Sequence, residues 1–283
     1  MIKILITGAN SYIGTSFEKW VSQWPEQYEV DTTDMRSDEW ENFSFSSYDV
    51  IYHIAAIVHI KENDPNKYFQ VNRDLAVKVA KKAKKEGIKQ FVFLSTMGVY
   101  GTETGSITVY TKPNPKTLYA KSKLEAETIL NGLSDSNFKV AILRPPIVYG
   151  NNCSGNYSRL ASLAEKLPVF PKINNERSMI FIDNLSEFVR KIIDFNDEGL
   201  FFPQNREYVN TSELVKLVAE AHSKDLRLTR IINPFVNLGI KLSGTFGKVF
   251  GTFTYDKKMP GGPDDAFEYE VCSFKESIKR TEK

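Results

Sequence analysis

The sequence predicts an α/β fold in which a doubly wound parallel sheet is followed by a smaller C-terminal α/β cap. Short apolar runs typical of buried strands alternate with apolar residues at helical spacing through the first 150 residues. A turn with two glycines joins the first strand to the first helix, and after Gly150 the regular alternation gives way to a loop and mainly helical segments. We therefore expect one domain over residues 1–150 and a ligand-binding region over residues 151–283, interleaved with the first.

The expected elements follow from the spacing of apolar residues and from capping residues. Strands are expected at residues 3–6, 28–33, 49–56, 91–95 and 140–143. A helix is expected after the first strand, and another begins at Asp64 and Pro65, an N-cap followed by proline, and stops at Gly87. A third helix spans residues 119–130. In the cap we expect helices at 157–166, 185–193 and 212–221 and a strand at 179–182, whereas residues from 233 onward give only weak signals.

The overall charge indicates a small-molecule partner. The 283 residues include 37 Lys and Arg against 35 Asp and Glu, a net charge of +2. This balance gives the chain no general attraction to nucleic acid or to an anionic membrane. The lysine-rich helix before Gly87 carries its lysines largely between its apolar positions, as a solvated helix face does. We therefore expect no nucleic-acid partner.

The cysteine and histidine content favours a reducing compartment and no metal. Cys153 and Cys272 cannot form a disulfide framework, and neither lies in a metal-type cluster with His53, His59 or His222. We expect His53 and His59 to be packed or turn histidines rather than metal ligands. No signal-peptide pattern and no stretch near the roughly 18 apolar residues of a membrane span is present. The sequence thus predicts a cytoplasmic protein without membrane insertion.

The first turn has the position of a dinucleotide-binding turn, between a strand and the start of a helix. The N–H groups and the positive dipole end of the helix can hold a pyrophosphate, and glycines let the backbone approach it. Ser11 occupies a glycine position of the usual fingerprint, so an ordinary glycine turn stays open as the alternative. The candidate cofactor-binding residues of this turn are Gly8, Asn10, Ser11, Tyr12, Ile13 and Gly14.

Asp34 is a candidate for binding the adenosine ribose. It lies 20 residues after Gly14, at the end of the next expected strand, where an acid accepts hydrogen bonds from the ribose hydroxyls. Its carboxylate would repel a 2′-phosphate, and the glycine turn has no Arg or Lys, so NAD is favoured over NADP. Arg36 argues against this preference, and a solvated loop acid is the alternative for Asp34.

Tyr119 and Lys123 are candidates for acid/base chemistry because they stand four residues apart on one face of an expected helix. To act as a base near pH 7, the tyrosine pKa must drop by roughly 3 units from about 10, or about 4 kcal/mol. One charge at about 4 Å with an effective dielectric near 20 supplies about that much. A surface tyrosine and lysine are the alternative. Thr96, just past the strand at 91–95, adds a hydroxyl where sheet-edge ligand sites form.

Together these motifs resemble an extended short-chain dehydrogenase/reductase of the NAD-dependent nucleotide-sugar epimerase/dehydratase family, whose nucleotide domain is of the Rossmann type. The resemblance runs from residue 4 to about 195, through the TGxxxxxG turn, the HIAA strand end, LSTMGVYG, YAKSK and RPPIVYG. It implies that Thr96 and Tyr119 are catalytic and that Lys123 binds the nicotinamide ribose and tunes Tyr119. Ala55 and Ala56 would belong to the cofactor site. Asn156 and Arg177 resemble residues that bind the phosphates of the nucleotide sugar.

The resemblance implies a UDP-hexose or UDP-N-acetylhexosamine 4-epimerase that acts through a transient 4-keto sugar. Thr96 is followed by Met97 and Gly98, whereas dehydratases of this family usually have an acidic pair there, so no acid is ready to eliminate water. The HIAAIVH and NERS segments resemble a bacterial subset that makes surface-polysaccharide precursors. A 4-keto-sugar reductase using NAD(P)H, and a dinucleotide sensor without catalysis, remain the alternatives. The oligomeric state is left open, with a homodimer as one arrangement.

Overall fold

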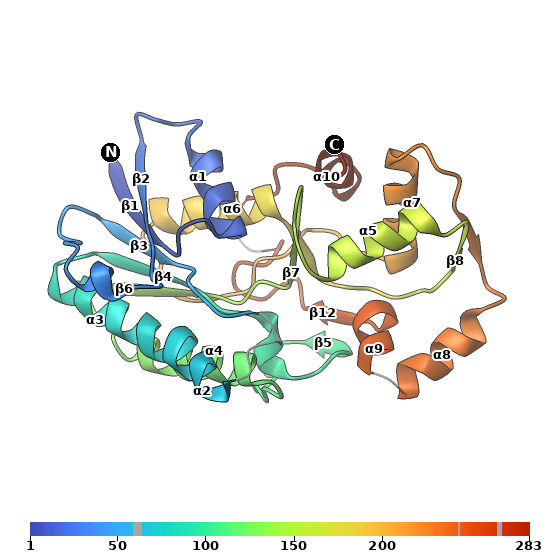
Figure 1. Ribbon diagram of the computed structural model, residues 1–283, viewed down its shortest axis with the longest axis horizontal. Coiled ribbons are helices and arrows are strands. Elements are labelled where there is room, and N and C mark those ends of the chain that lie inside the picture. Colours follow the sequence, from blue (N-terminus) through green and yellow to red (C-terminus); the bar gives the residue numbers. More distant parts are fainter. Residues whose placement is uncertain (59–63, 243, 265–267) are drawn as a thin grey trace. The chain divides into compact units, whose positions relative to one another are not determined.

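The computed structural model describes residues 1–58, 64–242, 244–264 and 268–283 (Figure 1). The chain forms two compact units. The first contains residues 1–101, 112–145 and 186–201, and the second contains residues 102–111, 146–185 and 202–283. The chain thus enters each unit more than once, and the expected functional division at residue 150 stays a prediction.

The first unit is built on a six-stranded parallel sheet, which confirms the predicted doubly wound α/β fold. The strand order is β10-β6-β4-β3-β1-β2. Five of these strands lie where the sequence predicts strands. The sixth, β10, comes from beyond residue 150 and was not predicted. The strands are β1 (Ile2–Thr7), β2 (Tyr28–Thr33), β3 (Val50–His53), β4 (Gln90–Leu94), β6 (Lys139–Leu143) and β10 (Gly199–Phe201).

Helices cover both faces of this sheet. One face carries α1 (Tyr12–Val21) and α6 (Ile182–Asp194), which the Trp20 indole joins by donating to the Glu187 carboxylate at 2.9 Å (Figure 1). The opposite face carries α2 (Pro65–Phe69), α3 (Ala76–Lys85) and α4 (Leu118–Asn131) (Figure 1). The apolar stripes that predict these helices therefore pack against the sheet.

Two expected elements of the first unit differ from the structure. The expected strand at 49–56 ends at His53, because the N–H groups of Ile54 and Ala55 both donate to the Thr7 carbonyl, at 3.1 and 2.9 Å. The expected single helix from 64 to 87 is interrupted by a π-helical turn, Gln70–Leu75, between α2 and α3. Such turns are frequent at functional sites, and this one contains the buried Asn72.

The described residues of the second unit form three small parallel strand pairs and five helices. The strands pair as β7 (Ile147–Tyr149) with β9 (Met179–Phe181), β8 (Val169–Pro171) with β11 (Arg227–Thr229), and β5 (Gly105–Ile107) with β12 (Phe253–Tyr255). The helices are α5 (Asn156–Lys166), α7 (Thr211–Ala221), α8 (Asn233–Leu242), α9 (Gly244–Phe250) and α10 (Phe274–Thr281). Of these, α5, α7 and β9 lie where the sequence predicts them, and the elements after residue 225 were not predicted.

A buried ion pair fixes α4 against the carboxyl end of the sheet in the first unit. The Arg144 guanidinium donates to both Glu127 carboxylate oxygens at 2.5 to 3.1 Å, and also to the Tyr100 hydroxyl at 2.8 Å. The Ser95 hydroxyl donates to the same carboxylate. All four side chains are buried, so removing one member would leave the others as uncompensated polar groups.

We expect Arg144→Met to lower the free energy of unfolding by about 3–5 kcal/mol, because it leaves the Glu127 carboxylate buried without its counter-charge. The matched control is Lys89→Met, which removes an exposed ion pair with Asp49 and should cost less than about 1 kcal/mol. Chemical denaturation of both variants measures the difference. Equal effects from the two substitutions would show that the buried pair does not hold α4 in place.

Candidate active site

The turn after β1 is shaped for close approach of a ligand to the backbone. Gly8 has a φ of +122°, and a Cβ at this position would lie 2.9 Å from the Ala55 nitrogen. A Cβ on Gly14 would lie 2.5 Å from a methyl carbon of Ile54. Asn10, with a φ of +62°, completes the tight turn. Both glycines are therefore required, and the sharp turn delivers the chain to the N-terminus of α1.

The structure explains why Ser11 stands where the dinucleotide-binding fingerprint usually has a glycine. It is the N-cap of α1, and its hydroxyl accepts a hydrogen bond from the Gly14 N–H at 3.1 Å. The next residues, Tyr12 and Ile13, begin the helix, where the first N–H groups have no partner within the helix. The first turn carries no acidic side chain. The donors and the positive helix end suit the pyrophosphate of a dinucleotide.

Asp34 follows β2 directly, close to the glycine turn. The carbonyl of Thr33 accepts hydrogen bonds from the Gly8 and Ala9 N–H groups at 3.0 and 3.1 Å, which ties the end of β2 to the turn. Arg36 pairs with the Asp34 carboxylate through its guanidinium and its backbone N–H. This pairing lowers the pKa of Asp34 to about 2. The acid is thus ionised at neutral pH, and its role toward a ribose stays a prediction.

Thr96 and Tyr119 are brought together in the structure. Thr96 caps the short 3-10 turn Met97–Tyr100, and its hydroxyl oxygen accepts from the Gly98 N–H at 3.0 Å. A hydrogen bond between the Thr96 and Tyr119 side chains lowers the tyrosine pKa, but burial outweighs it and raises the pKa of Tyr119 to about 12. Desolvation of the phenol thus opposes the lowered pKa that general-base chemistry near pH 7 requires, so that lowering depends on nearby positive charge.

Lys123 is the most buried cation of the site, with 1% of its side chain exposed. Its ammonium donates to the Leu94 carbonyl at 2.8 Å and lies 4.5 Å from the centre of the Phe93 ring. Desolvation lowers the pKa of Lys123 to about 7, against an opposing contribution from the Glu127 carboxylate. The lysine therefore shares the α4 face with Tyr119 but is anchored to the end of β4 rather than hydrogen-bonded to the phenol.

Asn72 joins the cofactor side of the site to α4. Its side-chain oxygen accepts from the Ile57 N–H at 2.8 Å, and its side-chain nitrogen donates to the Ile57 carbonyl and to the Ser122 hydroxyl, both at 3.1 Å. The segment after Ala55 and Ala56 is thereby fixed to the helix that carries Tyr119. This role is not among the predictions from the sequence. Its one signal there is that Asn72 lies four residues after Tyr68, and hence on the apolar face of the expected helix.

His53 is a packed histidine, as predicted, within the first unit. Its Nδ1 lies 2.7 Å from the Thr7 hydroxyl oxygen, and its ring stacks on Phe91 and Phe93. Burial and the charge of Lys123 lower the pKa of His53 to about 3, so the ring is neutral at physiological pH. His59 lies outside the described residues.

Arg177 is a buried cation of the second unit and has no carboxylate partner among the described residues. Only 6% of its side chain is exposed. One terminal nitrogen donates to the carbonyls of Gly251 at 2.9 Å and Gly247 at 3.3 Å, whereas the buried Nε has no hydrogen-bond partner within the described part of the chain. Desolvation lowers the pKa of Arg177. A buried guanidinium without a hydrogen-bonded carboxylate is stabilised when an anion supplies its counter-charge.

The other candidate residues of the second unit give less information. Asn156 begins α5, directly after Gly155, whose φ is +102°. Glu165, His222 and Glu282 have ligand atoms within 4.8 Å of one another. His222 Nε2 lies 2.8 Å from the Glu282 carboxylate, so hydrogen bonding accounts for the cluster, and the expectation of no metal stays a prediction. Among the described residues, no helix is long and apolar enough to cross a membrane.

Comparison with known sequences gives a family and two informative relatives. Residues 4–202 match the NAD dependent epimerase/dehydratase family. The chain is 31% identical over 244 residues to the UDP-glucose 4-epimerase of Vibrio cholerae, covering 81% of this chain and 70% of that protein. It is 23% identical over 269 residues to the N-acetyl-alpha-D-glucosaminyl-diphospho-ditrans,octacis-undecaprenol 4-epimerase of Escherichia coli O157:H7, covering 88% and 81%.

Comparison with solved structures supports the fold. The UDP-N-acetylglucosamine 4-epimerase from Bacillus cereus superposes with a TM-score of 0.76 at 16% identity, covering 100% of this chain and 98% of the other. At this identity the likeness concerns the fold alone. It agrees with the parallel sheet described above.

We expect the protein to bind NAD more tightly than NADP, and Asp34→Ala to reduce that preference by roughly tenfold, because a charge-assisted contact to the ribose is lost. Calorimetric titration of both cofactors gives the ratio of dissociation constants. Asp38→Ala, which removes a nearby exposed acid, is the matched control. Tighter binding of NADP by the parent protein would mean that Arg36, rather than Asp34, governs the adenosine end.

Proposed function

The chain belongs to the NAD dependent epimerase/dehydratase family, and on this basis we propose that it is a 4-epimerase of sugars carried on uridine diphosphate. It is an NAD-dependent enzyme of the extended short-chain dehydrogenase/reductase type. The observation that carries the proposal is the pairing of the Thr96 and Tyr119 hydroxyls one helical turn from the buried Lys123. A protein that only senses a dinucleotide has no need of these three residues together.

The proposed reaction moves one proton and one hydride in each direction. NAD, when bound, supplies the acceptor for the C4 hydride and returns it. Tyr119 takes the proton of the sugar 4-hydroxyl on its phenolate oxygen, while the Thr96 hydroxyl hydrogen-bonds the same sugar oxygen. When the hydride returns to the other face of the 4-keto sugar, Tyr119 gives the proton back. No proton, hydride or other group is consumed overall, as epimerisation requires.

The electrostatics of the site define what Tyr119 needs in order to act as a base. Burial holds its pKa at about 12, so a positive charge must favour the phenolate. Lys123 lies one helical turn away, and its pKa of about 7 leaves it partly protonated near neutral pH. The oxidised nicotinamide would add a second positive charge. Lys123 is therefore proposed to lower the pKa of Tyr119. The family resemblance further implies a contact between Lys123 and the nicotinamide ribose.

The diphosphate of the substrate is proposed to bind Arg177 and Asn156. The guanidinium of Arg177 is planar and can form two parallel hydrogen bonds to phosphate oxygens, and its Nε has no hydrogen-bond partner among the described residues. Both curated relatives named above act, by their names, on a sugar joined to a diphosphate, UDP in one and a polyprenyl diphosphate in the other. We propose UDP-hexose or UDP-N-acetylhexosamine as substrate and surface-polysaccharide precursors as product.

A 4-keto-sugar reductase is the second candidate. The observation that favours it is Arg36, whose guanidinium lies at Asp34 and could pair with the 2′-phosphate of NADPH. Such an enzyme would use the same hydroxyl groups of Thr96 and Tyr119 and the Lys123 ammonium, but it would release oxidised cofactor after each turnover. An epimerase turns over with the cofactor that it already holds.

We expect Tyr119→Phe to lower turnover of UDP-glucose or UDP-N-acetylglucosamine by about 10²–10⁴-fold, because the ring still packs but the proton carrier is gone. Affinity for NAD should change by no more than a few-fold. Tyr110→Phe, at a tyrosine that is 89% exposed, is the control and should behave as the parent. Parent-like turnover by the Tyr119 variant would mean that another group is the base.

We expect Arg177→Ala to weaken UDP binding by about 10- to 150-fold, as the loss of a charge-assisted contact worth roughly 1.5–3 kcal/mol implies. NAD affinity, measured on the same sample, should hardly change and shows that the variant is folded. Arg177→Lys keeps the charge, so its affinity for UDP should lie between those of the parent and of Arg177→Ala. If the parent binds no UDP, or the variant and parent bind it equally, the proposed diphosphate contact is wrong.

A further inference from the structure

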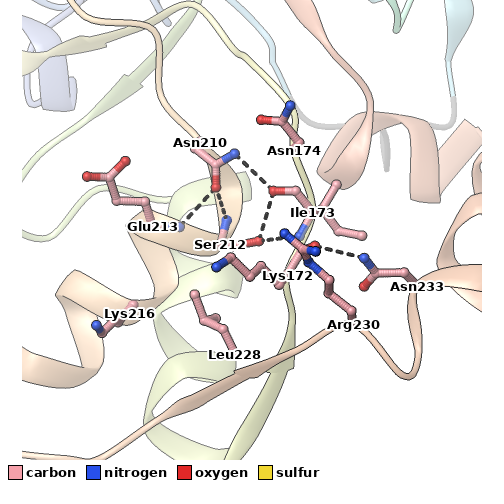
Figure 2. Close-up of a pocket in the computed structure, with 10 residues that line it drawn as sticks. All are labelled: Lys172, Ile173, Asn174, Asn210, Ser212, Glu213, Lys216, Leu228, Arg230 and Asn233. Atoms are coloured by element: carbon pink, nitrogen blue, oxygen red, sulfur yellow. Dashed lines mark hydrogen bonds between the residues drawn. The ribbon is translucent and has the colours of Figure 1, made fainter.

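The second unit carries a polar cavity of about 670 Å³ whose lining residues have no role in the proposed reaction (Figure 2). Its wall is formed by the end of β8, the start of α7 and the segment that joins β11 to α8. Asn210 caps α7 with its side-chain oxygen and donates to the Ile173 carbonyl at 3.0 Å, and the Asn233 side chain donates to the Lys172 carbonyl at 2.8 Å. Hydrogen bonds thus hold the three segments around the hollow.

Cations outnumber acids around this cavity. Lys172, Lys216 and Arg230 line it against a single carboxylate, that of Glu213 (Figure 2). Lys216 lies 3.6 Å from the Glu220 carboxylate on its own helix. Within the described residues, neither Lys172 nor Arg230 forms an ion pair. Their charges are therefore available to an external anion.

Large apolar side chains stand exposed immediately beside the cavity. Ile231 lies between the cavity residues Arg230 and Asn233 and is 83% exposed. On α8, Phe235 is 76% exposed and Leu238 is 55% exposed. Phe235 and Leu238 are three positions apart on α8, so their side chains share one helical face, and Ile231 lies in the turn that leads into this helix. An exposed apolar cluster on a protein surface marks an interaction site.

The apolar face is attached firmly to the cavity wall through α9. The ring of Phe246 packs directly on the backbone of Gly239, where a Cβ would lie 2.7 Å from the ring. Phe246 in turn packs against Phe250, and Phe250 against Phe170 of β8, with ring centres 5.9 and 5.8 Å apart. The helix pair α8 and α9 is thus held to β8 by aromatic contacts rather than projecting as a free arm.

The local charge decides what partner fits this face. From Leu226 to Tyr255 the chain has no Asp or Glu and has four Lys or Arg, although the whole protein is nearly neutral. We propose that the α8 face and the adjoining cavity dock on an anionic lipid bilayer. Ile231, Phe235 and Leu238 enter the interfacial region, while Lys172 and Arg230 meet headgroup phosphates.

An anionic bilayer can bind the apolar residues and the cations of this surface at the same time. Exposed apolar residues gain by leaving water at the boundary of the acyl chains, and neighbouring cations are attracted by the negative surface potential of anionic lipid. A neutral apolar partner would leave the cations unused, and a soluble anion would leave three large side chains in water. Docking of this kind needs no membrane-spanning helix, and it places no demand on the proposed reaction.

Co-sedimentation with lipid vesicles tests the proposal on the full chain. The parent protein should bind vesicles of equal parts phosphatidylglycerol and phosphatidylcholine, bind vesicles of pure phosphatidylcholine at least about tenfold more weakly, and be released by high salt. The double variant Phe235→Ser with Leu238→Ser should lose at least about tenfold in vesicle affinity, as should Lys172→Glu with Arg230→Glu.

Matched variants in the first unit distinguish vesicle binding through this surface from non-specific adsorption. Phe195→Ser removes an apolar side chain that is 63% exposed, and Lys81→Glu with Lys85→Glu reverses two exposed charges on α3. Both should bind vesicles as the parent does. Absence of parent binding to the anionic vesicles, or equal loss in the control variants, would overturn the proposal. So would a parent dimer that Phe235→Ser converts to monomer without any vesicle binding, because the face would then join two copies of the chain.

Discussion

The burial of Lys123 is the constraint on which the candidate active site depends. An ammonium removed from water needs a fixed acceptor, and here it is the carbonyl of Leu94 at the end of β4. This contact holds α4 against the carboxyl edge of the sheet, so that Tyr119, one turn earlier on the helix, meets Thr96. Asn72 on one side, and the buried pair of Glu127 with Arg144 on the other, keep the helix in this position.

The second unit also contains a buried cation held by fixed hydrogen-bond acceptors. Arg177 is buried, its described partners are backbone carbonyls, and its Nε is left without an acceptor in the described residues. Neither this guanidinium nor the Lys123 ammonium has a direct carboxylate partner in the described part of the chain, and desolvation lowers the pKa of both. Groups held in this state favour ligands that bring negative charge or hydroxyl acceptors. Under the proposed function, this preference is what would favour a sugar joined to a diphosphate.

The sequence predicts the sheet well because its strands are continuous apolar runs between glycine turns and amphipathic helices. It predicts the second unit poorly, since strands of three residues such as β8 and β11 are too short to show a period, and α8 is apolar on a face that nothing in the described chain covers. The pairing of Thr96 with Tyr119 follows from their motifs. The pKa of Tyr119 does not, because spacing along a helix reveals charge neighbours but not desolvation. Glu127, four residues after Lys123, could have been found by the same helical spacing.

Following the C4 hydrogen of the substrate tests most directly whether the protein epimerises with a retained cofactor. Protein as purified, without added cofactor, is incubated with UDP-glucose and with UDP-N-acetylglucosamine deuterated at C4, and the products are analysed by mass spectrometry and NMR. We expect formation of the C4 epimer with deuterium retained at C4, since the hydride leaves and returns within one active site. Loss of the deuterium to solvent, or turnover of a 4-keto sugar only when reduced cofactor is added, would contradict it.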